Sequence, residues 1–228
     1  MVKEIILASK SGVRKKILEV NNIKCKIEPS NVDEDSIKES LLKEKATPTI
    51  ISKNLAELKA NKISQKFIEE MVLGADSVID LEGEIISKPK DRAEATQILQ
   101  SLSNDTHQVI TAVGFLQKNK WECIHEISEV TFGFLSDEAI QSYVKSGSPM
   151  DKAGAYGIQD SFGVQNILSI SGSYTNIIGL PVAQVLEKLK EIIGEVNDGN
   201  WGEYSQFFNN DIELFIKVIT RYDFTNIR

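Results

Sequence analysis

A hydroxyl-rich turn near the start of the chain could bind an anion. Ser9, Ser11 and Arg14 follow the strand-like run 4–8 and open an amphipathic helical pattern. Free backbone N–H groups and the helix dipole favour a negative ligand at a helix start, and the hydroxyls and the guanidinium add donors. The alternative is an N-capped helix with a solvated Arg14, since short motifs recur by chance. The glycine and lysine spacing of a Walker loop is absent.

Two acidic positions are candidates for a base or a metal site. Asp76 follows the apolar run 71–73 and the small residues Gly74 and Ala75, which predicts a carboxylate at the end of a buried strand. Ligands bind at that end of open sheets, although a lone Asp there is more often a turn former or helix cap. Glu34 is one of three adjacent acids, a pattern typical of a solvated loop. A divalent metal on phosphate oxygens needs only one or two carboxylates, so both residues together would suffice.

The nine-residue run 151–159, D-K-A-G-A-Y-G-I-Q, reads as a loop that lets a ligand approach its backbone. Lys152 could contact phosphate. Gln159 offers donors and an acceptor suited to the edge of a nucleotide base. The alternative for Gln159 is a loop side chain bonded to its own backbone.

These segments resemble the Maf family of nucleoside triphosphate pyrophosphatases. The matching pieces stand in the family's order and cover about residues 3–195: Leu7-Ala8-Ser9-Lys10-Ser11 with Arg14, Gly74-Ala75-Asp76-Ser77, Lys88-Pro89 and the run 151–159. The resemblance implies an ITPase-like, two-lobed fold with a central nucleotide cleft. It also implies metal-dependent hydrolysis, with Mg²⁺ or Mn²⁺, of a nucleoside triphosphate to monophosphate and pyrophosphate, a role in nucleotide-pool sanitation, and a homodimer.

The resemblance also assigns roles to single residues. Asp76 matches the family's proton acceptor and, with Glu34, would hold the metal. Lys59 and Lys88 match two lysines that would offset charge on the phosphates, although without the family each is one exposed lysine among many. The substrate-binding set is Ser9, Ser11, Arg14, Lys152 and Gln159.

Three positions bear on which base is recognised. The family's dTTP- and UTP-cleaving branch has Arg, Thr and Gln where this chain has Val13, Ser77 and Gln159, and the branch acting on 7-methyl-GTP tends to have Trp, Gln and Glu. Ser77 and Gln159 therefore favour a pyrimidine. Val13 removes a bidentate donor and weakens that inference.

The elements that must position these residues alternate between strand and helix. Periodicity predicts strands at 4–8, 24–28, 71–79, 85–86, 106–116, 121–134 and 164–170, and helices after Ser11, over 37–67 with a break near Pro48, and at 93–102, 137–143 and 181–193. The expected fold is therefore α/β, a mixed β-sheet flanked by helices. His107, at the start of a strand, is expected to be a structural histidine at the sheet edge without a catalytic role.

Composition excludes several classes of protein. A chain of 228 residues with a formal charge of −7 is a poor binder of duplex nucleic acid, which requires a basic face. Cys25 and Cys123 are expected to be reduced thiols. No charged leader and no apolar run long enough for a bilayer is seen, so we expect a cytoplasmic protein that does not bind membranes.

The domain organisation is expected to be one Maf-like domain over 1–197 and an aromatic-rich extension over 198–228. Five apolar positions at helical spacing between Phe208 and Tyr222 predict a helix docked on its own domain, which we favour over a partner-binding element.

Two other functions remain open from the sequence. One is a nucleotide-binding regulator of cell division without significant turnover, since the family is also linked to septum formation. The other is a general phosphatase that releases single phosphates. A complete set of acids and lysines, at Glu34, Asp76, Lys59 and Lys88, favours catalysis.

Overall fold

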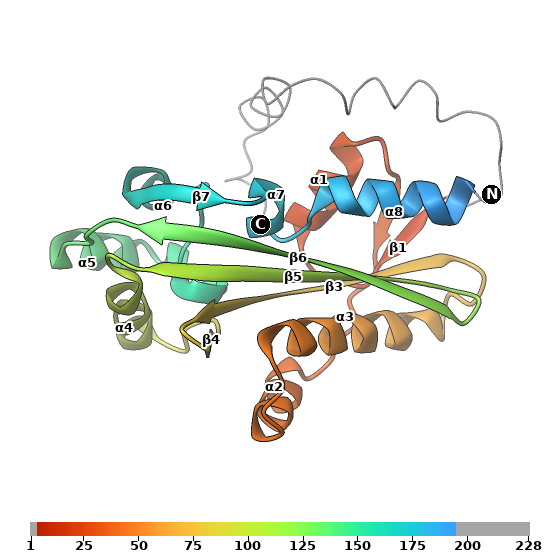
Figure 1. Cartoon of the computed structure of the whole chain (residues 1–228), viewed down its shortest axis with the longest axis horizontal. Coiled ribbons are helices and arrows are strands. Elements are labelled where there is room, and N and C mark those ends of the chain that lie inside the picture. Colours follow the sequence, from red (N-terminus) through yellow and green to blue (C-terminus); the bar gives the residue numbers. More distant parts are fainter. Residues whose placement is uncertain (1–3, 195–228) are drawn as a thin grey trace.

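Three long antiparallel strands form the middle of one mixed sheet (Figure 1). A computed structural model describes residues 4–194 of the chain. The sheet order is β2-β1-β3-β5-β6-β7, and β4 pairs with β3. The strands are β1 Ile5–Leu7, β2 Cys25–Ile27, β3 Met71–Leu81, β4 Glu84–Ile86, β5 Thr106–Gln117, β6 Lys120–Phe132 and β7 Ile167–Ser171. β1 runs parallel to β2 and β3, and the other pairings are antiparallel.

Helices cover both faces of this sheet. Figure 1 shows α1 and α8 on one side of the long strands and α3 on the other. The helices are α1 Gly12–Val20, α2 Glu34–Lys43, α3 Pro48–Ser64, α4 Arg92–Leu102, α5 Asp137–Ser146, α6 Ser161–Asn166, α7 Tyr174–Ile177 and α8 Val182–Gly194, with 3₁₀ turns η1 Ser148–Asp151 and η2 Ala153–Ala155. Hydroxyl and carboxylate caps start several of them, as when Ser136 accepts from the Ala139 N–H at the start of α5.

The hydrophobic core divides between the two ends of the long strands. At one end, alternate residues of β3 such as Leu73 and Ala75 pack under α1 and α8, while Val72 and Val78 pack against α3. At the other end, Ile79 joins a cluster built by α4, α5 and the segment 153–162. The mixed sheet flanked by helices is confirmed. We call the parts around the two ends of the core the two lobes, and β3, β5 and β6 run through both of them.

One edge of β3 is open between these two lobes. β1 pairs with β3 only as far as Leu73, and β4 pairs with it from Ile79 onward. The stretch 74–78 therefore has a strand partner only on the β5 side. Gly74 lets α3 approach here, because a Cβ at that position would lie 2.0 Å from the Ala56 carbonyl oxygen.

Most of the predicted elements are confirmed, with three corrections. Asp76 lies inside the long β3 rather than at a strand end, although it follows the end of the neighbouring β1. The predicted strand 164–170 begins as helix α6, and only its later part is β7. His107 is buried on β5, an interior strand, and not at the sheet edge.

Other expectations concern the ends of the chain and its surface. The aromatic extension 198–228 and the boundary at 197 lie outside the described residues, so the domain division stays a prediction. Among residues 4–194, none of the helices combines the length and the apolar character that crossing a membrane requires. Cys25 and Cys123 are both free thiols.

Candidate active site

A buried lysine joins the two predicted acidic residues. Lys59 Nζ lies 2.7 Å from Asp76 Oδ1 and 2.9 Å from Glu34 Oε1, and Lys59 is only 5% exposed. It lies on the buried face of α3, on the same side of the helix as Ile51, Leu55 and Ile63. α2 brings Glu34 to this face at its first residue. The structure therefore brings Glu34, Lys59 and Asp76 into one contact, and Lys59 is not an exposed lysine.

Asp76 has an unusual environment for a carboxylate. Its Oδ2 atom is buried and has no hydrogen-bond partner among the described residues. Burial raises the pKa of Asp76, although the Lys59 ammonium acts in the opposite direction. Partial burial also favours the neutral form of Glu34, but Lys59, together with Lys38 and Arg14, lowers the pKa of Glu34 overall. The site thus has one carboxylate oxygen free to accept a proton or a cation.

Arg14 caps the open edge of β3. Its guanidinium donates to the Ala75 carbonyl at 3.0 Å and to Ser77 Oγ at 3.0 Å, so it contacts the residues on both sides of Asp76. It also donates to Ser9 Oγ at 3.2 Å and to the Gly179 carbonyl at 2.7 Å. The Ala8 N–H donates to the Leu73 carbonyl on this same edge, so Arg14 continues the bonding that β1 leaves off. The solvated Arg14 of the alternative interpretation is wrong.

Replacing Arg14 by lysine should destabilise the fold. A single ammonium cannot span acceptors in the β1–α1 turn, β3 and the segment after α7, so Arg14→Lys should lower the free energy of unfolding by about 2–4 kcal/mol. Urea denaturation measures this difference. Lys15→Arg is the matched control, because Lys15 on the same helix makes only a half-exposed pair with Glu19. Equal stability of both variants would contradict the clamp.

The other residues of the first turn have simpler roles. Ser11 is the N-cap of α1 and accepts from the Arg14 N–H at 3.2 Å. Ser9 is buried and accepts from the Ser11 N–H. Val13 packs on the edge of the cluster under α1 and α8. The N-capped helix is therefore confirmed, and Ser9 lies in direct contact with Arg14.

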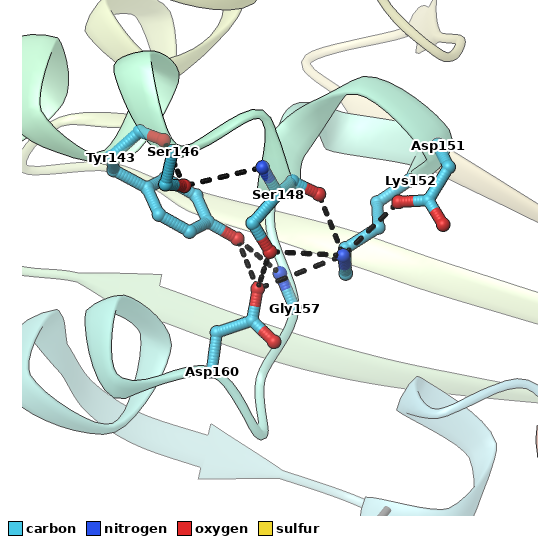
Figure 2. A network of polar contacts seen from close by, with 7 residues as sticks. All are labelled: Tyr143, Ser146, Ser148, Asp151, Lys152, Gly157 and Asp160. Atoms are coloured by element: carbon cyan, nitrogen blue, oxygen red, sulfur yellow. Dashed lines mark hydrogen bonds and ion pairs between the residues drawn. The ribbon is translucent and has the colours of Figure 1, made fainter. Parts of the chain in front are cut away.

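The glycine-bearing loop, residues 151–159, is held by a polar network of its own (Figure 2). Asp160 Oδ2 accepts from Tyr143 and from Ser148 Oγ, the latter at 2.8 Å. Lys152 Nζ donates to the Ser148 carbonyl at 2.6 Å and lies 3.7 Å from Asp160 Oδ2. The predicted phosphate ligand Lys152 is thus held within the loop and does not contact Asp76.

Backbone contacts attach this loop to the Lys88 segment and to β3. The Gly154 N–H donates to the Ser87 carbonyl at 3.3 Å, next to Lys88, which is exposed. A Cβ at Gly154 would lie 2.5 Å from Ile79 Cδ1, and its φ of +72° also favours glycine. The loops that carry Lys88 and Lys152 are therefore adjacent, although neither lysine reaches the Glu34–Lys59–Asp76 contact.

Two further predicted side chains, His107 and Gln159, differ from each other in their hydrogen bonding. His107 is buried and its Nε2 lies 2.7 Å from the Tyr156 hydroxyl, which agrees with a structural role under the loop. Burial lowers the pKa of His107 to about 4, so it is neutral near pH 7. Gln159 Nε2 is a buried donor with no partner in the part of the chain that the structure describes. The alternative in which Gln159 bonds its own backbone is not seen for this atom.

Three residues at this site are not predicted from the sequence. Thr111 on β5 lies 2.8 Å from Ser77 Oγ, Asn176 on α7 accepts from Thr111, and the Gly179 carbonyl accepts from Arg14. The dense polar run S-G-S-Y-T-N at 171–176, directly after a strand, was the available signal. Thr111 gave none, because it lies within an apolar strand pattern.

Comparison with known proteins places nearly all of the described region in one family. The family model for Maf-like proteins matches residues 4–192. The chain belongs to the Maf-like protein family. A relative from Pelagibacter ubique named nucleoside triphosphate pyrophosphatase is 58% identical to this Maf-like chain over 196 residues, which cover 84% of the chain and all of the relative. A Bacillus cytotoxicus relative named dTTP/UTP pyrophosphatase is 38% identical over 83% of this chain and 96% of its own length.

Solved structures give a weaker likeness. The Staphylococcus aureus Ham1 protein is 17% identical to this Maf-like chain, with a TM-score of 0.37 over 57% of this chain and 72% of the other.

Proposed function

We propose that this Maf-like protein hydrolyses a nucleoside triphosphate between the α and β phosphates, giving the monophosphate and pyrophosphate. The observation that carries the proposal is the contact of the buried Lys59 and Asp76 with the partly exposed Glu34, in which one buried oxygen of Asp76 has no partner among the described residues. The names of the relatives from Pelagibacter ubique and Bacillus cytotoxicus support the same reaction.

Asp76 is the proton acceptor in this proposal. Hydrolysis at the α phosphorus requires a water in line with the leaving group, a base for its proton and positive charge for the pyrophosphate. The Oδ2 atom of Asp76 has no partner among the described residues and would accept the proton of the water, while Oδ1 is held by Lys59. Burial raises the pKa of Asp76, which makes it a stronger base than an exposed carboxylate. Lys88, exposed beside the glycine-bearing loop, stays a candidate for contact with the phosphates.

A divalent cation fits the residues present. Glu34 and Asp76 would hold Mg²⁺ or Mn²⁺ together with phosphate oxygens, and the unpaired Oδ2 atom is a suitable ligand. Within residues 4–194 no three His, Cys, Asp or Glu side chains form a metal-binding group, so the protein alone would not enclose the ion. When bound, the cation would neutralise charge on the triphosphate.

The product mixture and its metal dependence test the proposal. Purified protein with UTP or dTTP and Mg²⁺ should release pyrophosphate and the monophosphate in equal amounts. EDTA should reduce the rate by at least about 100-fold, and excess Mg²⁺ or Mn²⁺ should restore it. Undiminished turnover in EDTA would contradict the metal site. Nucleotide binding without product would favour the regulator, and release of single phosphates would favour a phosphatase.

The proposal extends to a homodimer. Three large apolar side chains near the edge strand β7 are exposed: Phe134 at 72%, Val164 at 68% and Leu168 at 73%. Burial of such side chains against a second copy would remove them from water. Light scattering should give twice the mass of one chain, and a monomer at micromolar concentration would contradict the dimer.

A further inference from the structure

Behind Ser77 lies a chain of hydrogen bonds that crosses the sheet. Arg14 Nη2 donates to Ser77 Oγ at 3.0 Å, and Ser77 Oγ lies 2.8 Å from Thr111 Oγ1. Thr111 Oγ1 in turn donates to the backbone carbonyl of Asn176 at 3.1 Å. Ser77 is half-buried, whereas Thr111 and Asn176 are fully buried, so the chain runs from the open edge of β3 into the core.

The two ends of this chain fix the direction of every proton in it. A carbonyl only accepts, so the single hydroxyl proton of Thr111 is committed to Asn176. Thr111 must therefore accept from Ser77. At the other end a guanidinium only donates, so Ser77 accepts from Arg14 while its own proton goes to Thr111. Ser77 is left with a lone pair and no free proton.

The side chain of Asn176 anchors the far end. Its Nδ2 donates to the Val109 carbonyl and to Ser128 Oγ, both at 2.9 Å. Ser128 Oγ also donates to the Ser173 carbonyl at 3.2 Å, which ties α7 to β5 and β6. Because only the NH₂ group can donate to the Val109 carbonyl, these contacts also fix the orientation of the Asn176 amide. These side-chain contacts hold Asn176 in place, and with it the backbone carbonyl that accepts from Thr111.

Ser77 is placed to meet a ligand at the open edge of β3. It follows Asp76 directly, so the two side chains point to opposite faces of the strand, within the stretch that has a strand partner only on the β5 side. Gly179 leaves room next to it, since a Cβ there would lie 3.9 Å from Ser77 Oγ and no closer than 3.6 Å to Arg14.

We propose that Thr111 and Asn176 are positioning residues that select the nucleotide base by holding Ser77 as an obligate hydrogen-bond acceptor. This inference rests on the proposed function and adds a selection rule to it. Uracil, thymine, guanine and hypoxanthine present a ring N–H at the pairing edge, which matches an acceptor. Cytosine and adenine present a lone pair there, which faces the lone pair of Ser77 without a proton between them. Donation to Thr111 also strengthens Ser77 as an acceptor, because hydrogen bonds in a chain polarise one another.

The ratio of kcat/KM for UTP to that for CTP tests the rule. We expect wild type to favour UTP by at least about tenfold, the effect of one mismatched buried hydrogen bond. Thr111→Val keeps the shape of the side chain but removes its hydroxyl, which frees the Ser77 proton to donate to cytosine. The ratio should fall by about tenfold, mainly through faster use of CTP. Thr111→Ser keeps the hydroxyl and should keep the wild-type ratio.

A second variant covers the case in which Thr111→Val does not fold. Ser77→Ala changes only a half-buried side chain and should also lower the ratio, here mainly through slower use of UTP because the acceptor is removed; adding Thr111→Val to it should cause no further change. An unchanged ratio in either single variant, or equal losses with UTP and CTP, would overturn the inference. If wild type makes no pyrophosphate, the proposed function fails separately, and the ratio of Kd values for UTP and CTP then decides the rule.

Discussion

Asp76→Asn should lower kcat by about 10²–10⁴-fold with every nucleotide, because it removes the proton acceptor and keeps the shape of the side chain. The fold should survive, since Lys59 keeps Glu34 as an ion-pair partner at 2.9 Å. A continuous pyrophosphate-release assay measures the loss, and thermal unfolding measures the stability.

Asp80→Asn is the matched control for this substitution. Asp80 lies on the same strand and its Oδ1 accepts from the Gly83 N–H in the turn after β3, a contact that asparagine can also make. We expect wild-type kcat for this variant. Loss of activity in both variants, or in neither, would remove Asp76 from its assigned role.

Lys59→Met should have the largest effect on stability. Lys59 is the only described cation that contacts Asp76 directly, and breaking a buried ion pair costs about 3–5 kcal/mol because the remaining charge is uncompensated. Urea denaturation at pH 7 should show a loss of this size. Lys62→Met, on the exposed side of the same helix, is the control: it removes only an exposed hydrogen bond to the Asn31 carbonyl and should cost at most about 1 kcal/mol.

The same variant should shift the pH dependence of activity. Burial already raises the pKa of Asp76 and Lys59 opposes this, so removing Lys59 raises the pKa further. A group whose pKa is higher in the folded than in the unfolded protein contributes its full stability at pH values below the unfolded pKa. That contribution is lost as the pH rises through the folded pKa. Lys59→Met should therefore lose less stability in mild acid than at pH 7, and the acid limb of its kcat/KM profile should move to higher pH. An unmoved acid limb would contradict the coupling of Lys59 to Asp76.

The sequence predicts most of the fold because the alternation of apolar residues is strong in the long strands. It fails at 164–166, where the apolar Val164 is 68% exposed on α6 and so does not report burial in a sheet. It also places Asp76 at a strand end, because the apolar run 71–73 is followed by the small residues Gly74 and Ala75. In the structure those residues instead make room for α3 and for α1.

The site is predicted less completely than the fold. The acids and lysines are identified by resemblance, but that Lys59 joins Glu34 to Asp76 depends on how α2 and α3 cross, which periodicity does not specify. The helical spacing of Lys59 does carry a signal of burial, since Lys59 falls in the stripe of Ile51, Leu55 and Ile63. Thr111 and Asn176 could not be found, because hydrogen bonds between residues 65 positions apart in sequence leave no local pattern.

The most direct test of the central claim is hydrolysis of UTP in ¹⁸O-labelled water, followed by mass spectrometry of the separated products. Attack at the α phosphorus, with Asp76 as proton acceptor, predicts one ¹⁸O atom in UMP and none in pyrophosphate. Label in pyrophosphate would show attack at the β phosphorus, and labelled single phosphate would show a different reaction; either result would contradict the account.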